Sequence, residues 1–359
     1  MSESTIETPE AKLRSFIQPI SFVLLITIIL SIFTLEYYAW LQEIDPDFTP
    51  PDPSPVPEDP EDPGGIAWGA TLNMLFYVLL AFIGGLVVLI VIKKGFMQLL
   101  VYFFAAIMGF SWFIFGLFYG GIVSVMIIYL LWDFLPEIIR IWINSLFDTL
   151  FEPLLFLFAI ILGILGVVSF GIQSFEKIWL RNVMMIVFGA MIGSMLAIHL
   201  GLLTTLFILI GLSLYDIYAV FRGPLKGIID HSREEAELFE EKMSYQNEVE
   251  YEKGPLLPAL PVYSTPLINI GLGDFAFFSM LISAAVVIGN DLANPIPLIA
   301  ALVGLFTGAI YTFKLLKKER ALPGLPLPVF GGLGCLALGV IISLILGFAT
   351  IDSIIGLFL

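Results

Sequence analysis

The chain has 359 residues, of which 59% are hydrophobic and only 13% are charged, and its net charge is −15 at pH 7. Soluble proteins carry roughly 25% charged residues, so these values exclude a soluble globular fold of this length. The acidic balance argues against nucleic acid as a partner. A single cysteine, Cys335, and two histidines, His199 and His231, exclude an internal disulfide and a metal site built from such residues, so we expect neither a metal nor a cofactor.

Nine apolar runs are long enough to cross a membrane as helices. In chain order they cover residues 16–39, 67–92, 96–119, 151–172, 178–199, 201–221, 267–289, 295–316 and 326–348. The runs are continuous rather than alternating, which excludes an outer-membrane barrel. We therefore expect an all-α polytopic membrane protein with nine transmembrane helices after a short tail at 1–15. The lipid bilayer is an expected partner, and the cell membrane is the expected location.

Two segments between these runs are poor in apolar residues. Residues 41–65 hold eight prolines and eight aspartates or glutamates but no lysine or arginine, which is typical of an extended linker. Residues 223–266 form the longest loop, and the glutamate-rich stretch 230–243 predicts a short amphipathic surface helix. The expected division is therefore six helices within 16–222, this loop, and three helices within 267–359.

The orientation of the chain depends on the stretch 120–150. Its first half is apolar, but Arg140 and several acidic residues follow, so it is either a tenth span or an amphipathic helix at the membrane surface. With nine spans and the N-terminus inside, 15 of the 16 lysines and arginines fall on the inner side, and only Arg140 lies outside. The positive-inside rule therefore favours a cytoplasmic N-terminus, an outer C-terminus and an outer insertion at 120–150.

Two aspartates lie within predicted spans, Asp216 in the sixth and Asp274 in the seventh. A charged residue inside a span costs about 3 kcal/mol and is therefore a functional candidate. At 1.5 Å per residue both lie about 9–11 Å from the inner ends of two antiparallel spans, so their carboxyls can face each other. Two neighbouring carboxyls in a low-dielectric site share one proton. Aspartic proteases use this arrangement to activate water and to polarise a carbonyl group.

The neighbours of the two aspartates fit the same chemistry. Gly271 and Gly273 have no side chain, so backbone or substrate can approach closely beside Asp274. Tyr215 either donates a hydrogen bond to Asp216 or packs against other residues. The alternative reading is that each aspartate makes only a buried structural hydrogen bond.

Two short motifs contain these aspartates. They are Tyr215-Asp216 in the sixth run and Gly271-Leu272-Gly273-Asp274 in the seventh. They resemble the YD and GxGD motifs of the presenilin and signal peptide peptidase family of intramembrane aspartyl proteases, in particular its archaeal-type members. The resemblance covers the membrane core, most firmly from 178 to 348. It implies that Asp216 and Asp274 are catalytic and that the substrates are transmembrane segments of membrane proteins.

The third motif of that family, Pro-Ala-Leu, stands at the start of its ninth helix. The residues at this place are Pro323-Gly324-Leu325-Pro326, so Gly324 stands where the family has alanine. The resemblance implies that these four residues shape the site and engage substrate. A literal Pro258-Ala259-Leu260-Pro261 lies in the long inner loop instead. Its two prolines disfavour a helix, so an extended segment that pairs with substrate is expected there.

Three other functions remain open from the sequence. A prepilin-type peptidase shares the aspartate chemistry but lacks the Pro-Ala-Leu element. An ion channel or proton-coupled transporter would use the membrane aspartates as a relay. A serine protease of the rhomboid type would need Ser213 to pair with His199. The sequence does not determine the physiological substrate, the cleavage position, the accessory subunits or the oligomeric state.

Overall fold

The computed structural model describes residues 9–46, 48–49, 54–55, 63–132, 136–171, 178–227, 262–264, 269–316 and 324–357. Within this part of the chain, nine helices are long and apolar enough to cross a membrane. They are α1 (Pro9–Ile44), α2 (Pro63–Lys93), α3 (Met97–Leu131), α4 (Glu137–Gly171), α5 (Ile178–His199), α6 (Leu202–Phe221), α8 (Leu272–Asp291), α9 (Ile296–Leu316) and α10 (Pro326–Ile345). A short helix, α11 (Ile351–Gly356), follows α10. The predicted all-α polytopic fold with nine spans is therefore confirmed.

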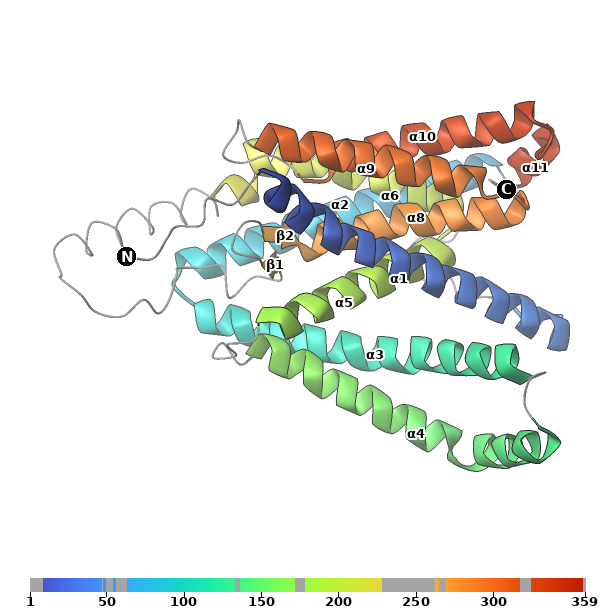
Figure 1. Cartoon of the computed structure of the whole chain (residues 1–359). Coiled ribbons are helices and arrows are strands. Elements are labelled where there is room, and N and C mark those ends of the chain that lie inside the picture. Colours follow the sequence, from blue (N-terminus) through green and yellow to red (C-terminus); the bar gives the residue numbers. More distant parts are fainter. Residues whose placement is uncertain are drawn as a thin grey trace.

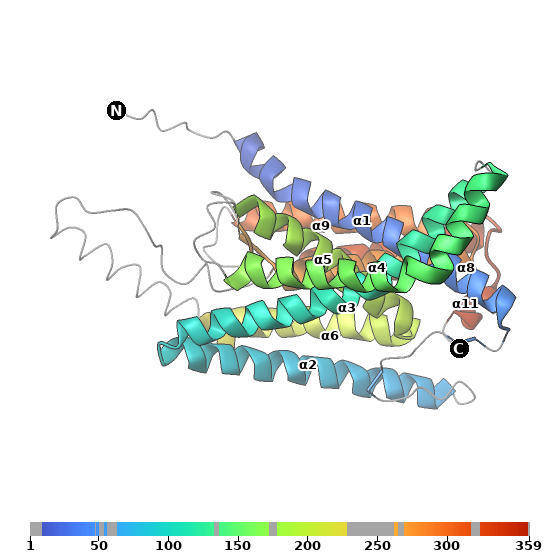
Figure 2. The same cartoon turned by 90° about the horizontal axis from the view of Figure 1, so that it is seen from below.

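Successive long helices run in alternating directions, so the helix ends gather at two ends of one bundle (Figures 1 and 2). We call the end where α6 stops and where α8 and α10 begin the motif end. Basic residues lie at the helix termini there. They are Arg14, Lys93, Arg181, Arg222 and Lys314. This distribution is what the positive-inside rule expects of a cytoplasmic face, and the orientation of the chain stays a prediction.

Helix α8 lies at the centre of the packing and contacts α5, α1 and α9. In the most apolar stretch of α8, 61% of the residues are buried, whereas in that of α2 the share is 6%. Helix α2 therefore presents most of its surface to lipid. Small side chains let the neighbouring helices approach α8 closely. Two buried hydroxyl pairs tie it to α1, Thr27 with Ser279 and Ser31 with Ser283, each at 2.8 Å between oxygens.

The third and fourth helices are longer than the sequence suggested. Helix α3 continues past 119 to Leu131, because the residues after 119 stay apolar and nothing among them breaks the helix. Helix α4 begins at Glu137 rather than at 151, and it bends along its length (Figures 1 and 2). Pro153 lies inside α4, and an internal proline removes a helix hydrogen bond and produces such a bend. The stretch 120–150 is thus divided largely between two helix ends, and its outer location stays a prediction.

The seventh spanning helix begins later than predicted. It was expected to start at 267, but residues Asn269–Gly271 form strand β2 and α8 begins at Leu272. Strand β2 pairs antiparallel with β1 (Val262–Ser264), so that Val262 stands opposite Gly271. Pro266 and Gly271 both disfavour a helix, which leaves the preceding backbone free to form this ladder. Asp274 therefore lies in the first turn of α8 rather than two turns inside the helix.

Several predicted segments lie outside the described residues. They are the surface helix at 230–243, the segment Pro258–Pro261, Pro323, and residues 47, 50–53 and 56–62 of the acidic linker 41–65. These predictions stay as the sequence analysis states them. The two ends of that linker are helical instead of extended, since α1 continues to Ile44 and α2 begins at Pro63.

Candidate active site

Asp216 lies five residues before the end of α6 and is partly buried. Its Oδ2 accepts a hydrogen bond from the backbone amide of Leu325 at 3.2 Å, and the amide of Gly324 also donates to this carboxyl group. Leu325 is the N-cap of α10. The amides at the start of a helix have no partner within that helix, and the helix dipole adds partial positive charge there. The start of α10 therefore provides the polar partners that a carboxylate inside a membrane requires.

Asp274 has a matching position at the start of its own helix. Gly271 is the N-cap of α8, so Asp274 occupies the third helical position, and its side chain reaches back to the backbone amide of Gly271. This is one half of a capping box, in which the third residue satisfies the amide of the N-cap. Asp274 thus lies in the first turn of its own helix, α8. Asp216, which belongs to α6, has its carboxyl group against the N-terminus of a different helix, α10.

Residues Gly324 and Leu325 bring the two aspartates to one place. A Cβ atom added to Gly324 would lie 3.1 Å from Oδ2 and 3.3 Å from Oδ1 of Asp274, while the next amide in the chain binds Asp216. The two carboxyl groups are also close enough to interact electrostatically. Helices α6, α8 and α10 pack against one another around this point. The structure therefore gathers both aspartates around the residues that stand in the place of the Pro-Ala-Leu motif.

The glycines of the second motif have different surroundings. Gly271 ends β2 in an extended conformation, with φ of −66° and ψ of 145°. Gly273 is exposed, and among the described residues a Cβ atom placed on it would meet Phe277 alone, at 3.7 Å. The position next to Asp274 in the chain thus has no side chain that would hinder the approach of water or of a peptide backbone. Leu272, between the two glycines, is partly buried and packs against the main core.

The structure resolves the two readings of Tyr215. Its hydroxyl donates to the carbonyl oxygen of Ala81 on α2 at 3.3 Å, so it fastens α6 to α2 instead of binding Asp216. Pro326 is buried as the first residue of α10. Proline suits this position because it has no amide hydrogen, and an amide there would have no partner within the helix.

His199 does not support a rhomboid-type pair with Ser213, because its Nε2 is 2.5 Å from the hydroxyl of Tyr38 and its Nδ1 is 2.7 Å from the carbonyl of Met195.

The backbone contact between Leu325 and Asp216 was not foreseen from the sequence. The only available signal was the proline at the start of the last run, which marks a helix N-terminus and hence a cluster of free amides. Across the described ranges of the chain, no group of three or more histidine, cysteine, aspartate or glutamate side chains is arranged to hold a metal ion. The groups that the structure places at this point are the two carboxyl groups and the backbone amides of Gly271, Gly324 and Leu325.

Comparison with known proteins adds one significant sequence match. No family model matches the chain. An alignment 181 residues long covers 48% of this chain and 32% of Presenilin-B from Dictyostelium discoideum, with 32% identity. The chain therefore spans about a third of the length of the curated relative that it matches. A solved presenilin family intramembrane aspartate protease aligns over 92% of this chain and 99% of its own, with a TM-score of 0.49 and 17% identity.

Proposed function

We propose that this chain, whose sequence match to Presenilin-B supports the presenilin and signal peptide peptidase family, is an intramembrane aspartyl endopeptidase. The observation that carries the proposal is the contact of both Asp216 and Asp274 with the consecutive residues Gly324 and Leu325 at the start of α10. A single aspartate in a span often makes only a structural hydrogen bond. Two that lie at one point, beside an open glycine, support a shared reaction centre.

The proposed reaction uses the pair as a general base and a general acid. One carboxylate takes a proton from water, whose oxygen attacks the carbonyl carbon of the peptide bond. The other carboxyl group, protonated, donates its proton to the carbonyl oxygen as the tetrahedral intermediate forms. The first carboxyl group then gives the proton that it took from water to the amide nitrogen, and the second carboxylate takes a proton from a hydroxyl of the intermediate as the C–N bond breaks. This returns the pair to its starting protonation state. The pair needs no metal for these steps, since the water is activated by the carboxylate itself.

The substrate of the proposed reaction is a transmembrane helix of another membrane protein. A peptide bond inside a helix is protected by the hydrogen bonds of that helix, so the substrate must unwind locally before attack. Strand β2 ends at Gly271, three residues before Asp274, and pairs with β1, so this ladder offers extended backbone near the site to which an unwound segment can pair. The motif end of the bundle is also the end at which water reaches both aspartates by the shortest path.

The test is cleavage of a transmembrane-helix peptide by the purified chain in liposomes. Asp216→Asn and Asp274→Asn keep the size of each side chain but remove its proton chemistry, so each is expected to lower the cleavage rate by about 10²–10⁴-fold. Asp291→Asn is the matched control. It changes the same charge on the same helix as Asp274 but at the opposite end of α8, and it is expected to cleave at the wild-type rate.

Thermal unfolding separates loss of chemistry from loss of fold, since all three variants are expected to unfold close to the wild-type temperature. Cleavage that persists in either motif variant would refute the proposed roles. Proton flux through wild-type liposomes that is lost in Asp216→Asn and Asp274→Asn, with no cleavage by any form, would favour the transporter alternative instead.

A further inference from the structure

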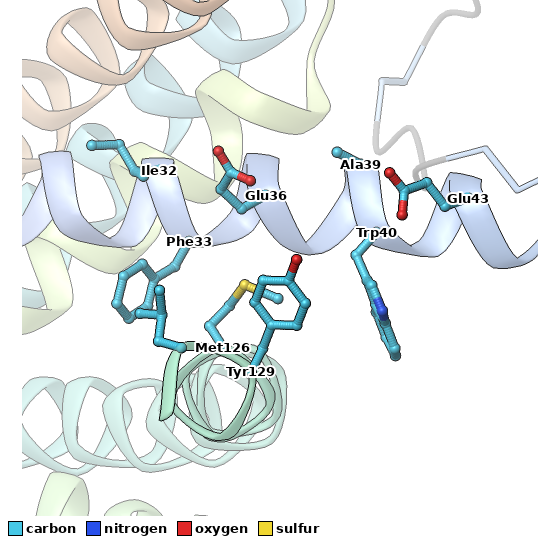
Figure 3. Close-up of a pocket in the computed structure, with 9 residues that line it drawn as sticks. Ile32, Phe33, Glu36, Ala39, Trp40, Glu43, Met126 and Tyr129 are labelled. Atoms are coloured by element: carbon cyan, nitrogen blue, oxygen red, sulfur yellow. The ribbon is translucent and has the colours of Figure 1, made fainter. Parts of the chain in front are cut away.

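A pocket lies between α1 and α3 at the end of the bundle opposite the motif end (Figure 3). It encloses about 400 Å³, within the range of small-molecule sites in proteins. Along α1 it extends from Ile32 to Glu43, which is about 16 Å at the helical rise per residue. Helix α1 ends at Ile44, one residue after the last pocket residue on it, so we expect the pocket to run from the end of the span to the level of the lipid headgroups.

The walls of the pocket change character along this length. The inner part is apolar and is formed by Ile32, Phe33 and Met126. The outer part contains two carboxylates and two large aromatic side chains, which are Glu36, Glu43, Trp40 and Tyr129. In Figure 3 both carboxylates lie along one edge of α1, and the aromatic rings lie along the other edge, with the Tyr129 hydroxyl directed at α1. The pocket is therefore amphiphilic, with an acidic and aromatic mouth above an apolar floor.

The charges at the mouth have no counter-ion among the residues that the structure describes. Within the part of the chain that the structure describes, neither Glu36 nor Glu43 takes part in a hydrogen bond or an ion pair. Aromatic faces attract cations, and a carboxylate beside such a face strengthens the attraction. The ligand that complements this arrangement carries a positive charge next to an apolar chain.

We propose that this pocket binds a phospholipid whose headgroup carries an ammonium group. The ammonium lies at the mouth of the pocket, against one of the two glutamates, which are about 10 Å apart along α1, and near one of the two aromatic rings. The first part of one acyl chain lies along Ile32 and Phe33. Leu130, which lines the same pocket and is 58% exposed, continues this apolar surface into the surrounding bilayer. The site is independent of the proposed protease centre, since the aspartate pair lies at the other end of the bundle.

A lipid fits these features better than a basic side chain of a bound peptide. The long apolar wall inside the span matches an acyl chain, and the headgroup level of the acidic mouth matches the position of a lipid amine. An anionic lipid that lacks the ammonium group would instead place its phosphate against two carboxylates. The protein should therefore distinguish two lipids that differ only in this group.

The test uses native mass spectrometry of the full chain in detergent with added phosphatidylethanolamine or phosphatidylglycerol of identical acyl chains. The wild type is expected to retain one phosphatidylethanolamine with about tenfold preference over phosphatidylglycerol. A contact between the ammonium and an aromatic ring, together with one carboxylate, supports a factor of this size. Glu36→Gln with Glu43→Gln should abolish the preference, and Trp40→Leu should weaken it. Glu137→Gln with Asp352→Asn, which removes two exposed negative charges from the same end of the bundle, should keep it.

Two outcomes would overturn the proposal. One is equal retention of the two lipids by the wild type, and the other is an unchanged preference in the Glu36 and Glu43 double variant. A third experiment adds a transmembrane peptide flanked by lysines to the same four forms of the protein. Binding of that peptide through Glu36 and Glu43, without any lipid preference, would assign the pocket to a basic segment of a protein partner and would likewise overturn the lipid assignment.

Discussion

Replacing Gly324 by alanine tests how closely the start of α10 controls the aspartate pair. The added Cβ would lie 3.1 Å from Oδ2 and 3.4 Å from Cγ of Asp274, where ordinary contacts begin at about 3.4 Å. Gly324 does not have a positive φ, so alanine introduces no backbone strain of the left-handed kind. The substitution therefore probes the contact with Asp274 and little else.

The strain has two routes of relief, and both disturb the pair. If the backbone withdraws by about 0.3 Å, the Leu325 amide moves from 3.2 Å to about 3.5 Å from Asp216, which is beyond the usual length of a hydrogen bond. If Asp274 turns away instead, its contact with the amide of Gly271 is weakened. A hydrogen bond to a charged group contributes about 1.5–3 kcal/mol, so losing part of one lowers the cleavage rate about tenfold.

The assay compares cleavage rate constants and thermal unfolding of the wild type and two variants. Gly334→Ala is the control, because it places the same methyl group inside α10, ten residues beyond Gly324, with no atom within 4 Å of the new Cβ. The control is expected to keep full activity and to gain about 0.5–1 kcal/mol of stability from the higher helix propensity of alanine. Equal activity of Gly324→Ala and Gly334→Ala would refute the reasoning.

Three further predictions concern packing around α8 and α6. Gly193→Ala should destabilise the fold by about 1–3 kcal/mol, because the added Cβ would collide with the carbonyl oxygen of Ala276. An unchanged unfolding temperature would contradict this close approach of α5 to α8. The hydroxyl of Thr27 already donates to the carbonyl oxygen of Val23, so Ser279 is the donor in the Thr27–Ser279 pair. A double-mutant cycle with Thr27→Val and Ser279→Ala, measured by unfolding in detergent, should give a coupling free energy of about 0.6 kcal/mol. Strictly additive effects of the two substitutions would contradict this hydrogen bond. Tyr215→Phe should retain cleavage within about twofold, since its hydroxyl binds α2 rather than Asp216, and a loss as large as in the aspartate variants would place that hydroxyl in the reaction.

The spans were predictable because the membrane imposes a simple rule on the sequence. A helix that crosses the hydrocarbon core needs about 20 apolar residues, and the nine runs identified by that criterion match the nine long helices of the described chain. The same rule does not say where a helix ends once it has left the core. Helix α3 therefore extends to Leu131, and α4 starts at Glu137, where the sequence alone suggested an insertion.

The depth argument for the two aspartates was correct about the end of the bundle and wrong about the local structure. It assumed that the seventh helix already runs from 267, whereas the chain is extended until Gly271. This difference matters for the site, because a residue in the first turn of a helix faces free amides and a residue two turns inside does not. Asp274 is held by the N-terminus of α8 for that reason.

The sequence by itself determined the class of the protein, the number of its spans and the two motifs that contain the membrane aspartates. Each of these is written in local composition or in a few adjacent residues, and the sequence match to Presenilin-B supports the family that the motifs indicate. Only the tertiary structure decided that Leu325 donates its amide to Asp216, 109 positions away, while Gly324 lies against Asp274. No local pattern encodes such a contact, because it depends on how α6, α8 and α10 pack together, and helix packing in a membrane follows the fit of many side chains along each helix.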